Sequence, residues 1–248
     1  VDANPNVLLA SLTGQGLTGP GSENASFGSA IEARSGIAAS TGYPGGLPVI
    51  SGRNLNYPDQ ISCLYAAAAI VSALHRQLIR PGAIHLDVSQ RDLAIFTIGD
   101  RIIDVSLGNA SVGPLGNFEP EFAQQASWRT ADGQWLAVSI RHEVAASLCR
   151  VLSIGSLGGI GDWISKQPLK TARNALCAMG AVCAPVQTGS QVFNDPLVVG
   201  GPAIGRTPAG ELAKGFPFQF EQAPMKITLE SPAIGEHNDQ LLRHQGGR

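Results

Sequence analysis

The hydrophobic and polar positions of the first hundred residues predict alternating strands and helices. A continuous apolar run over residues 6–14 is typical of a buried strand that ends in a glycine turn. Helical periodicity follows over residues 27–40, and again over residues 60–79 with Asp59 as the expected N-cap. Residues 83–89 alternate apolar and polar side chains, which predicts a second strand, and a further helix is expected from Gln90 to beyond Ile103. This order favours an α/β layer with parallel strands.

The pattern changes near residue 107, where glycine and proline become frequent. Residues 127–140 predict a hairpin with Asp132-Gly133 at its turn, and amphipathic helices are expected over residues 143–152 and 169–180. The tail contains a strand candidate at residues 216–220 and a short helix after Pro232. We therefore expect a large α/β domain over residues 1–107, a smaller α+β domain over residues 108–186, and a C-terminal segment, residues 187–248, that returns to the large domain.

Composition and charge narrow the class of protein. With 248 residues, 44% hydrophobic residues and 15% charged residues, the chain can form a sizeable core. The net charge is −2 and no segment carries a basic stripe, which argues against a nucleic-acid partner. The longest apolar run, residues 64–74, is too short to span a bilayer, so no membrane role is expected.

The cysteines and the start of the chain bear on where the protein works. Cys63, Cys149, Cys177 and Cys183 show no CxxC spacing, which argues against a disulfide framework or a metal site, and Cys63 is expected to be a buried thiol. A reducing, cytoplasmic location follows. The chain begins at Val1 without a signal peptide, which suggests a fragment, a processed product or one piece of a larger polypeptide.

A glycine motif follows the first predicted strand. Residues 14–19 fit the G-x-G-x-x-G pattern of dinucleotide-binding loops. Pro20, Gly21 and Ser22 come next, so no helix opens from the last glycine to bind a pyrophosphate. The acidic residue expected on the ribose would fall within a helical pattern, near Glu32. A turn is the better interpretation.

Asp92 is the acidic residue with the most chemical interest. Ser89-x-x-Asp92 is a capping-box pattern, and an acid in the first turn of a helix is favoured by the helix dipole, so a structural role would explain it. The same position, where a strand of an open α/β sheet passes into a helix, faces the crevice in which such sheets bind ligands. Asp92 is therefore either a helix-capping acid or a nucleophile. Asp87 is better explained as a solvated or locally paired acid.

Several blocks, in order, resemble the family III CoA-transferases, the group that includes formyl-CoA and carnitine CoA-transferases. Residues 10–20 (ASLTGQGLTGP) are similar to the glycine signature of that family, and residues 57–77 to one of its helices. Residues 85–95 (HLDVSQRDLAI) resemble the block whose second acid is the family's nucleophile, which falls on Asp92. The other similar segments are residues 27–36, 115–120, 129–140, 182–196 and 231–242.

The resemblance implies a fold and a reaction. The expected fold is a Rossmann-like open parallel sheet, incomplete at its N-terminal side because the family's N-terminal segment has no counterpart here, with a smaller α+β domain. The expected reaction moves CoA between an acyl-CoA thioester and a free carboxylic acid, through aspartyl anhydride and aspartyl-CoA intermediates on Asp92. Gly116 and Asn117, near Gly113, are the closest match to the family's glycine-rich active-site loop. Coenzyme A enters as a substrate, no cofactor is permanently bound, no metal is expected, and an interlocked homodimer is implied.

Two alternatives stay open at this point. The α-methylacyl-CoA racemases resemble this family but use a histidine and an aspartate as proton carriers, and Phe27 occupies the position of that histidine. The other alternative is a non-catalytic or structural half of a fused or split CoA-transferase. The racemase is disfavoured because no other histidine lies nearby in sequence.

Overall fold

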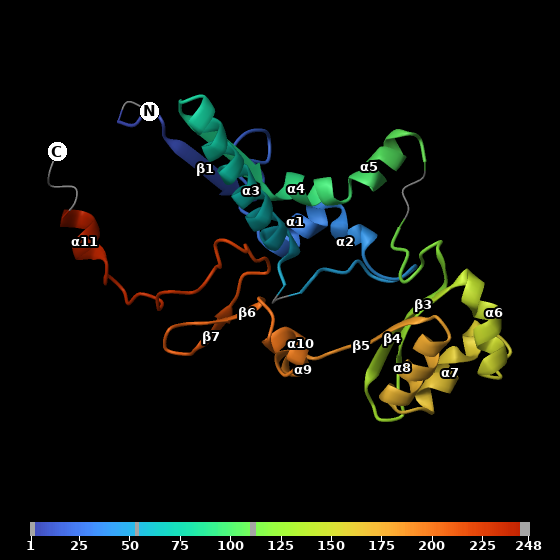
Figure 1. Cartoon of the computed structure of the whole chain (residues 1–248). Helices are drawn as coiled ribbons and strands as arrows, with labels where there is room; N and C mark the ends of the chain where they lie inside the picture. The colour runs from blue at the N-terminus through green and yellow to red at the C-terminus, as the bar shows by residue number, and fades with distance from the viewer. Residues whose placement is uncertain (1–2, 53–54, 110–112, 244–248) are drawn as a thin grey trace. The chain divides into compact units, whose positions relative to one another are not determined.

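The computed structural model describes residues 3–52, 55–109 and 113–243, and the chain divides into two compact units, residues 1–125 and residues 126–248 (Figure 1). The described part is mixed α/β. It contains one parallel sheet of two strands and two separate sheets with antiparallel pairing, one formed by three strands and the other by two. The three-part division at residues 107 and 186 stays a prediction.

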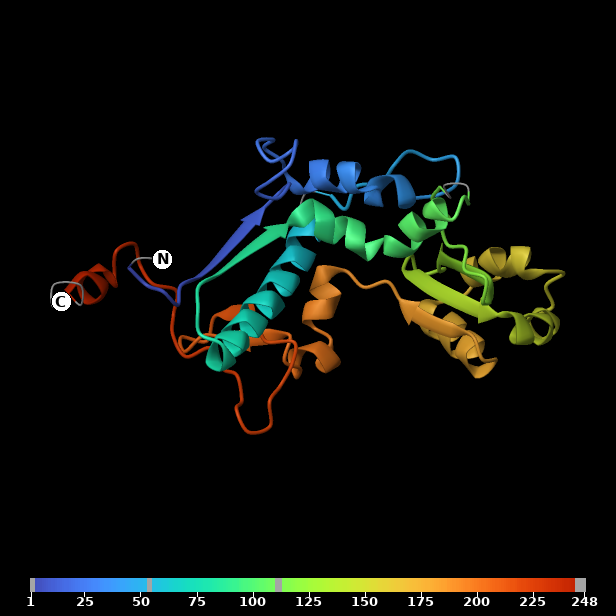
Figure 2. The ribbon, with the colours of Figure 1, turned by 90° about the horizontal axis from the view of Figure 1, so that it is seen from above.

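Two parallel strands organise the first unit. β1 (Leu8–Thr13) pairs with β2 (Ile84–Ser89) in a register that places Leu8 beside Ile84 and Thr13 beside Ser89. Helix α3 (Tyr57–Ile79) packs along both strands, and α4 (Gln90–Thr97) follows β2 directly (Figure 2). The predicted α/β layer with parallel strands is thus confirmed, and both strands end at the same edge of the sheet.

The helices of this unit differ from the prediction in their bounds: two predicted helices are each divided in two, and α3 begins earlier than expected. The helix expected over residues 27–40 breaks at Gly36, whose φ of 91° ends α1 (Gly28–Ser35) before α2 (Ile37–Ser40). The helix after β2 breaks at Ile98, which separates α4 from α5 (Gly99–Ser106). The prediction that Asp59 caps α3 is wrong, because the helix begins at Tyr57, with Asn56 at the N-cap position and Asp59 in the first turn. Proline at the second helical position allows this earlier start, since its missing N–H has no partner there in any case.

The second unit contains the predicted hairpin and the main apolar core. β3 (Phe122–Arg129), β4 (Trp135–Arg141) and β5 (Val182–Pro185) form a sheet in that order, with Asp132-Gly133 in the turn between the first two strands. Helices α6 (His142–Val151), α7 (Ile160–Ser165) and α8 (Leu169–Ala178), with the short helix η1 (Leu157–Gly159), complete the unit. The core consists of fully buried aliphatic side chains from these elements: Leu136, Ile140, Leu148, Ile160, Ile164 and Leu176.

The C-terminal part of this unit consists of short elements joined by loops. They are α9 (Gly189–Phe193), α10 (Pro196–Val199), the hairpin strands β6 (Ile204–Arg206) and β7 (Leu212–Lys214), and α11 (Asn238–Arg243), which confirms the predicted terminal helix. The strand predicted over residues 216–220 is wrong. The rings of Phe218 and Phe220 pack edge to face on each other, with centroids 5.7 Å apart, and both stay more than half exposed, so no sheet face buries them.

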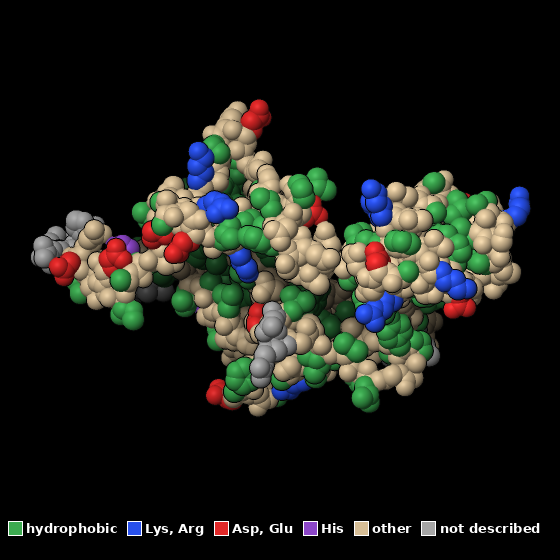
Figure 3. Space-filling model, turned by 90° about the horizontal axis from the view of Figure 1, so that it is seen from below, with side chains coloured by type: hydrophobic (Ala, Val, Ile, Leu, Met, Phe, Trp, Pro, Cys, Tyr) green, Lys and Arg blue, Asp and Glu red, His purple; other side chains and the backbone are tan. Residues whose placement is uncertain are grey.

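Helix α3 exposes much of its apolar surface. Leu64, Val71 and Leu78 are each more than 60% exposed, and Cys63 is exposed as well, so the prediction of a buried Cys63 thiol is wrong. Within the described residues, α3 has the length and composition needed to cross a bilayer, but a single helix of this kind is weak evidence, since core helices of soluble proteins also have these properties. Hydrophobic side chains also reach the surface on the face drawn in Figure 3.

Candidate active site around Asp92

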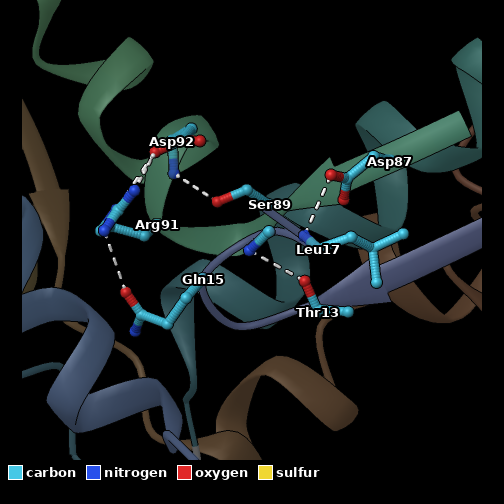
Figure 4. A network of polar contacts seen from close by, with 8 residues as sticks. Thr13, Gln15, Leu17, Asp87, Ser89, Arg91 and Asp92 are labelled. Carbon is cyan, nitrogen blue, oxygen red and sulfur yellow. Dashed lines mark hydrogen bonds and ion pairs between the residues drawn. The ribbon is translucent and has the colours of Figure 1, made fainter. Parts of the chain in front are cut away.

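Asp92 lies in the first turn of α4, three residues past Ser89, which ends β2 and is the N-cap residue of the helix. The Asp92 N–H donates to Ser89 Oγ at 3.2 Å, so Ser89 caps the helix as the sequence predicts (Figure 4). The carboxylate does not complete a capping box with the Ser89 backbone and is instead bound by a side chain, that of Arg91. The Asp92 side chain is 61% exposed, so its carboxylate is accessible to a reactant.

Arg91 connects Asp92 to the glycine turn. Its Nε and Nη2 both lie 3.1 Å from Asp92 Oδ1, and its Nη1 donates to Gln15 Oε1 at 3.2 Å (Figure 4). The Arg91 backbone N–H donates to Gly14 O at 3.1 Å. Arg91 is therefore held at both its backbone and its guanidinium, and α4 is fixed to the turn that follows β1.

Gln15 is the buried member of this network. Its side chain is 3% exposed, and its Oε1 accepts from Arg91. Gln15 Nε2 finds no hydrogen-bond partner among the described residues. A buried amide N–H without an acceptor typically costs about 1–3 kcal/mol, so this donor calls for an explanation.

The residues 14–19 form a turn, as predicted, and the next helix begins only at Gly28. The turn is fixed to both strands, because Gly16 N–H donates to Thr13 Oγ1 at 2.9 Å and Leu17 N–H donates to Asp87 Oδ2 at 3.0 Å. Gly16 has a φ of 88°, a conformation that glycine adopts without strain. Asp87 is thus a locally paired acid, which confirms its structural interpretation.

A cavity of about 450 Å³ opens beside Asp92, entirely within the first unit. Its polar wall is formed by Gln15, Asp87, Arg91 and Asp92, and its apolar wall includes Tyr65 and Phe96, whose rings pack edge to face with centroids 5.8 Å apart. The remaining lining residues are Gly16, Thr18, Ala69, Val88, Ser89 and Leu93. The cavity thus offers the exposed Asp92 carboxylate, the Asp87 carboxylate that is bonded to the glycine turn, and one cation next to an apolar surface, a combination suited to an acid with an organic tail.

Gly116 and Asn117 lie away from this cavity. Gly116 N–H donates to Gly42 O at 2.9 Å, and Asn117 Nδ2 donates to Tyr43 Oη at 3.1 Å. Neither residue is among those that line the cavity at Asp92. A role for this loop in the active site therefore stays a prediction.

Glu32 lies in a second, separate cavity of about 330 Å³. Its side chain is 1% exposed and accepts hydrogen bonds from the N–H of Ser51, at 2.8 Å, and from Ser51 Oγ. These contacts fix the loop before α3 to α1, so Glu32 has a structural explanation of its own.

No cysteine is among the residues that line the Asp92 cavity. Across residues 3–52, 55–109 and 113–243, no three His, Cys, Asp or Glu side chains are grouped as metal ligands would be. All four cysteines are free thiols. Burial, together with the neighbouring Cys177, raises the pKa of the Cys183 thiol to about 12, so this thiol is protonated at neutral pH.

The sequence predicted Asp92 but missed Arg91, which binds its carboxylate, and Gln15 of the glycine turn, which binds Arg91. Gln15 occupies a variable position inside the glycine motif, and Arg91 a variable position inside the Asp92 block. The sequence did contain a signal for these two residues. A polar or charged residue inside a motif that follows a strand lies at the same edge of the sheet as the motif residues themselves. The pairing of strands 70 residues apart was needed to bring the two together.

Comparisons with known proteins agree with this architecture. The family model for CoA-transferase family III matches residues 1–238. The chain is 26% identical to succinate–glutarate CoA-transferase of Agrobacterium fabrum and 31% identical to succinyl-CoA–D-citramalate CoA-transferase of Chloroflexus aurantiacus, in each case over 96% of this chain and 65% of the relative. The chain thus spans just under two thirds of the length of these relatives.

The fold is also similar to that of a solved structure. A CAIB/BAIF family protein from Brucella suis superposes with a TM-score of 0.85 at 22% identity, covering 98% of this chain and 69% of that one. With the family model matching nearly the whole chain, this chain belongs to CoA-transferase family III.

Proposed function

We propose that the protein transfers CoA between an acyl-CoA thioester and a free carboxylic acid, with Asp92 as the nucleophile. The observation that carries this proposal is the exposed Asp92 carboxylate, which lines a cavity at the carboxyl end of a parallel strand, where open α/β sheets bind ligands. The names of the relatives, which are CoA-transferases for succinyl and other dicarboxylic acyl groups, support the same reaction class.

The reaction proceeds by covalent catalysis. An oxygen of the Asp92 carboxylate attacks the donor thioester carbonyl, the C–S bond breaks, and CoA leaves as the thiolate, which gives an aspartyl acyl anhydride. The thiolate then attacks the Asp92 carbonyl, which releases the donor acid and leaves an aspartyl-CoA thioester. The acceptor carboxylate attacks that thioester to form a second anhydride, and the returning thiolate takes the new acyl group. Each step exchanges one activated carbonyl for another, which divides one difficult transfer into easier ones.

Each attack places negative charge on a carbonyl oxygen that needs a donor. The backbone N–H groups of Arg91, Asp92 and Gly116 are already bonded to Gly14 O, Ser89 Oγ and Gly42 O. The guanidinium of Arg91 lies beside the reacting carboxylate and supplies N–H donors there.

The proposal also includes the complete sheet, the oligomeric state, the cellular location and the active-site loop. We propose that β1 and β2 belong to a larger Rossmann-like open sheet, and that the protein acts as a cytoplasmic homodimer. The loop containing Gly116 and Asn117 would close over the acyl group, with water excluded because an anhydride hydrolyses readily.

The test is capture of the intermediate. The purified protein is incubated with formyl-CoA, acetyl-CoA or succinyl-CoA, and the peptide containing Asp92 is examined by mass spectrometry for a hydroxylamine-sensitive CoA adduct. Asp92→Ala should abolish the adduct and transfer while leaving the fold intact, since the capping N–H of residue 92 remains. Asp104→Ala, at an exposed acid of α5, is the matched control and should keep both. Transfer at the normal rate by Asp92→Ala would refute the proposal.

The racemase alternative requires a histidine as a proton carrier. No histidine is among the residues that line the cavity at Asp92, and Phe27, at the position of the racemase histidine, carries no exchangeable proton. Incubation in deuterium oxide with a 2-methylacyl-CoA distinguishes the two reactions. Deuterium incorporation at the α-carbon would indicate a racemase, whereas a CoA-transferase leaves that position unlabelled.

A further inference from the structure

We propose that Arg91 binds the carboxylate of the acceptor acid once Asp92 has been converted to its CoA thioester, and that Gln15 holds the guanidinium in place for this exchange. This inference rests on the function proposed above, and deepens it by assigning a site for the acceptor acid.

Acylation of Asp92 would change the balance of charge at Arg91. In the structure, Arg91 and Asp92 form an ion pair, and the Arg91 side chain is 29% exposed. When Asp92 becomes an anhydride or thioester, its negative charge is lost and the guanidinium stays charged, because arginine is not deprotonated in proteins. A partly buried cation without a counter-ion is unfavourable, so the site then favours an anion. The planar guanidinium matches the geometry of a carboxylate.

Arg91 is also the one cation among the residues that line this cavity. The second acid there, Asp87, accepts from Leu17 N–H and lies on β2. The nearby backbone N–H groups of Gly16 and Leu17 are likewise bonded, to the side chains of Thr13 on β1 and Asp87 on β2. An anion that enters the cavity therefore meets Arg91 as its natural partner.

Gln15 is the positioning residue. Its Oε1 accepts from Arg91 Nη1 at 3.2 Å, and a neutral amide can hold the guanidinium without neutralising it. Its own Nε2 is buried and has no acceptor among the described residues. Figure 4 shows the oxygen of the Gln15 amide directed toward Arg91 and the nitrogen directed away, so it is Oε1 that holds the guanidinium.

In the second half of the reaction, the positive charge of Arg91 faces one negative charge at every step. The acceptor carboxylate, paired with Arg91, attacks the Asp92 thioester carbonyl, and the C–S bond breaks with its electron pair leaving on the CoA thiolate. The thiolate then attacks the acyl carbonyl of the mixed anhydride, and the C–O bond breaks to return the Asp92 carboxylate. Arg91 thus faces one negative charge at each stage, first the acceptor, then the thiolate, and finally Asp92 again.

A binding experiment tests this without transferase turnover. Asp92→Asn removes the charge of residue 92 with little change in shape, so it imitates the acylated state. Calorimetry with glutarate and with acetate should show binding about tenfold tighter for Asp92→Asn than for the unmodified protein, the size expected for a charge-assisted pair. The double variant Arg91→Met/Asp92→Asn should lose that gain. Equal affinities for all three proteins, each confirmed as folded by circular dichroism, would overturn the inference.

A kinetic experiment separates the inference from the proposed function. With succinyl-CoA as donor and glutarate or acetate as acceptor, Arg91→Met should form the Asp92 adduct more slowly, because it loses a donor to the carbonyl oxygen, and should in addition show a KM for the acceptor raised about tenfold, with the donor KM little changed. Arg91→Lys should be intermediate, and Gln15→Met should raise the acceptor KM while leaving adduct formation intact. Arg80→Met, at an exposed arginine outside the cavity, is the matched control and should behave as the unmodified protein.

The outcomes distinguish the two proposals. Absence of any adduct in the unmodified protein would count against Asp92 as nucleophile, and the binding experiment would then decide the role of Arg91 alone. An adduct in Arg91→Met that the acceptor discharges with an unchanged KM would overturn the role of Arg91 while leaving Asp92 as the nucleophile.

Discussion

Asp87 Oδ2 accepts a hydrogen bond from the backbone N–H of Leu17 at 3.0 Å, and this contact fixes the glycine turn to β2. The two residues are 70 positions apart in sequence, and the parallel pairing of β1 with β2 brings them together. The turn carries Gln15, so the position of the Arg91 guanidinium depends on this contact as well.

Removal of the Asp87 carboxylate should loosen the turn. We expect Asp87→Ala to lower the free energy of unfolding by about 1 kcal/mol, since the lost hydrogen bond is partly exposed. Hydrogen exchange should show faster exchange of the Leu17 amide, with little change in the core of the second unit. Asp104→Ala serves as the control, and equal exchange of the Leu17 amide in both variants would contradict the role of this contact.

Ser89 should matter for both stability and the orientation of Asp92. Ser89→Ala removes the cap of α4 and should cost about 1 kcal/mol, while Ser89→Thr should retain most of it. Urea unfolding measures the stability, and the rate of Asp92 adduct formation, expected to fall in Ser89→Ala, measures the orientation. Thr188→Ala removes a comparable cap from α9, in the other unit, and should leave the adduct rate unchanged. A full adduct rate in Ser89→Ala would show that the cap does not orient Asp92.

The hairpin turn of the second unit should contribute to stability in a pH-dependent way. The hydroxyl of Thr130, the Leu169 N–H and the Gln134 amide donate to Asp132 and lower the pKa of its carboxyl below the usual 3.8. A group whose pKa is lower in the folded state stabilises the protein above its unfolded pKa, and this contribution is lost as the pH falls through the folded pKa.

We therefore expect Asp132→Asn to destabilise the protein at neutral pH and to make its stability less dependent on pH below about 4. Urea unfolding at a series of pH values between neutral and acid measures both effects. Glu211→Gln, at an exposed acid, is the control. If the free energy of unfolding fell equally steeply at acid pH in Asp132→Asn and in the unmodified protein, this turn would not be the cause of the pH dependence.

The core of the second unit offers a matched pair on one helix. Leu148 is fully buried on α6, whereas Val151, on the same helix, is 67% exposed. Leu148→Ala should lower the free energy of unfolding by about 2–5 kcal/mol, because it removes buried methyl groups and leaves a cavity. Val151→Ala should change it by less than about 0.5 kcal/mol. Similar losses for both variants would mean that this helix face is not packed as described.

Features that depend on local chemistry could be predicted from the amino-acid sequence. Hydrophobic periodicity located β1, β2, α3 and the hairpin around Asp132-Gly133, because strand and helix periods are local properties of the chain. The Ser89 cap also followed from local spacing, since a capping side chain bonds a backbone N–H only three residues away.

The environment of the site depends on contacts between residues far apart in sequence. Several local predictions also failed: two helices break, at Gly36 and Ile98, Cys63 is exposed, and residues 216–220 form no strand. The parallel pairing of β1 with β2 brings Gln15 to Arg91. Asp92 could be found from its motif, but its counter-ion and the buried amide behind that counter-ion depend on strand pairing, which no local pattern encodes.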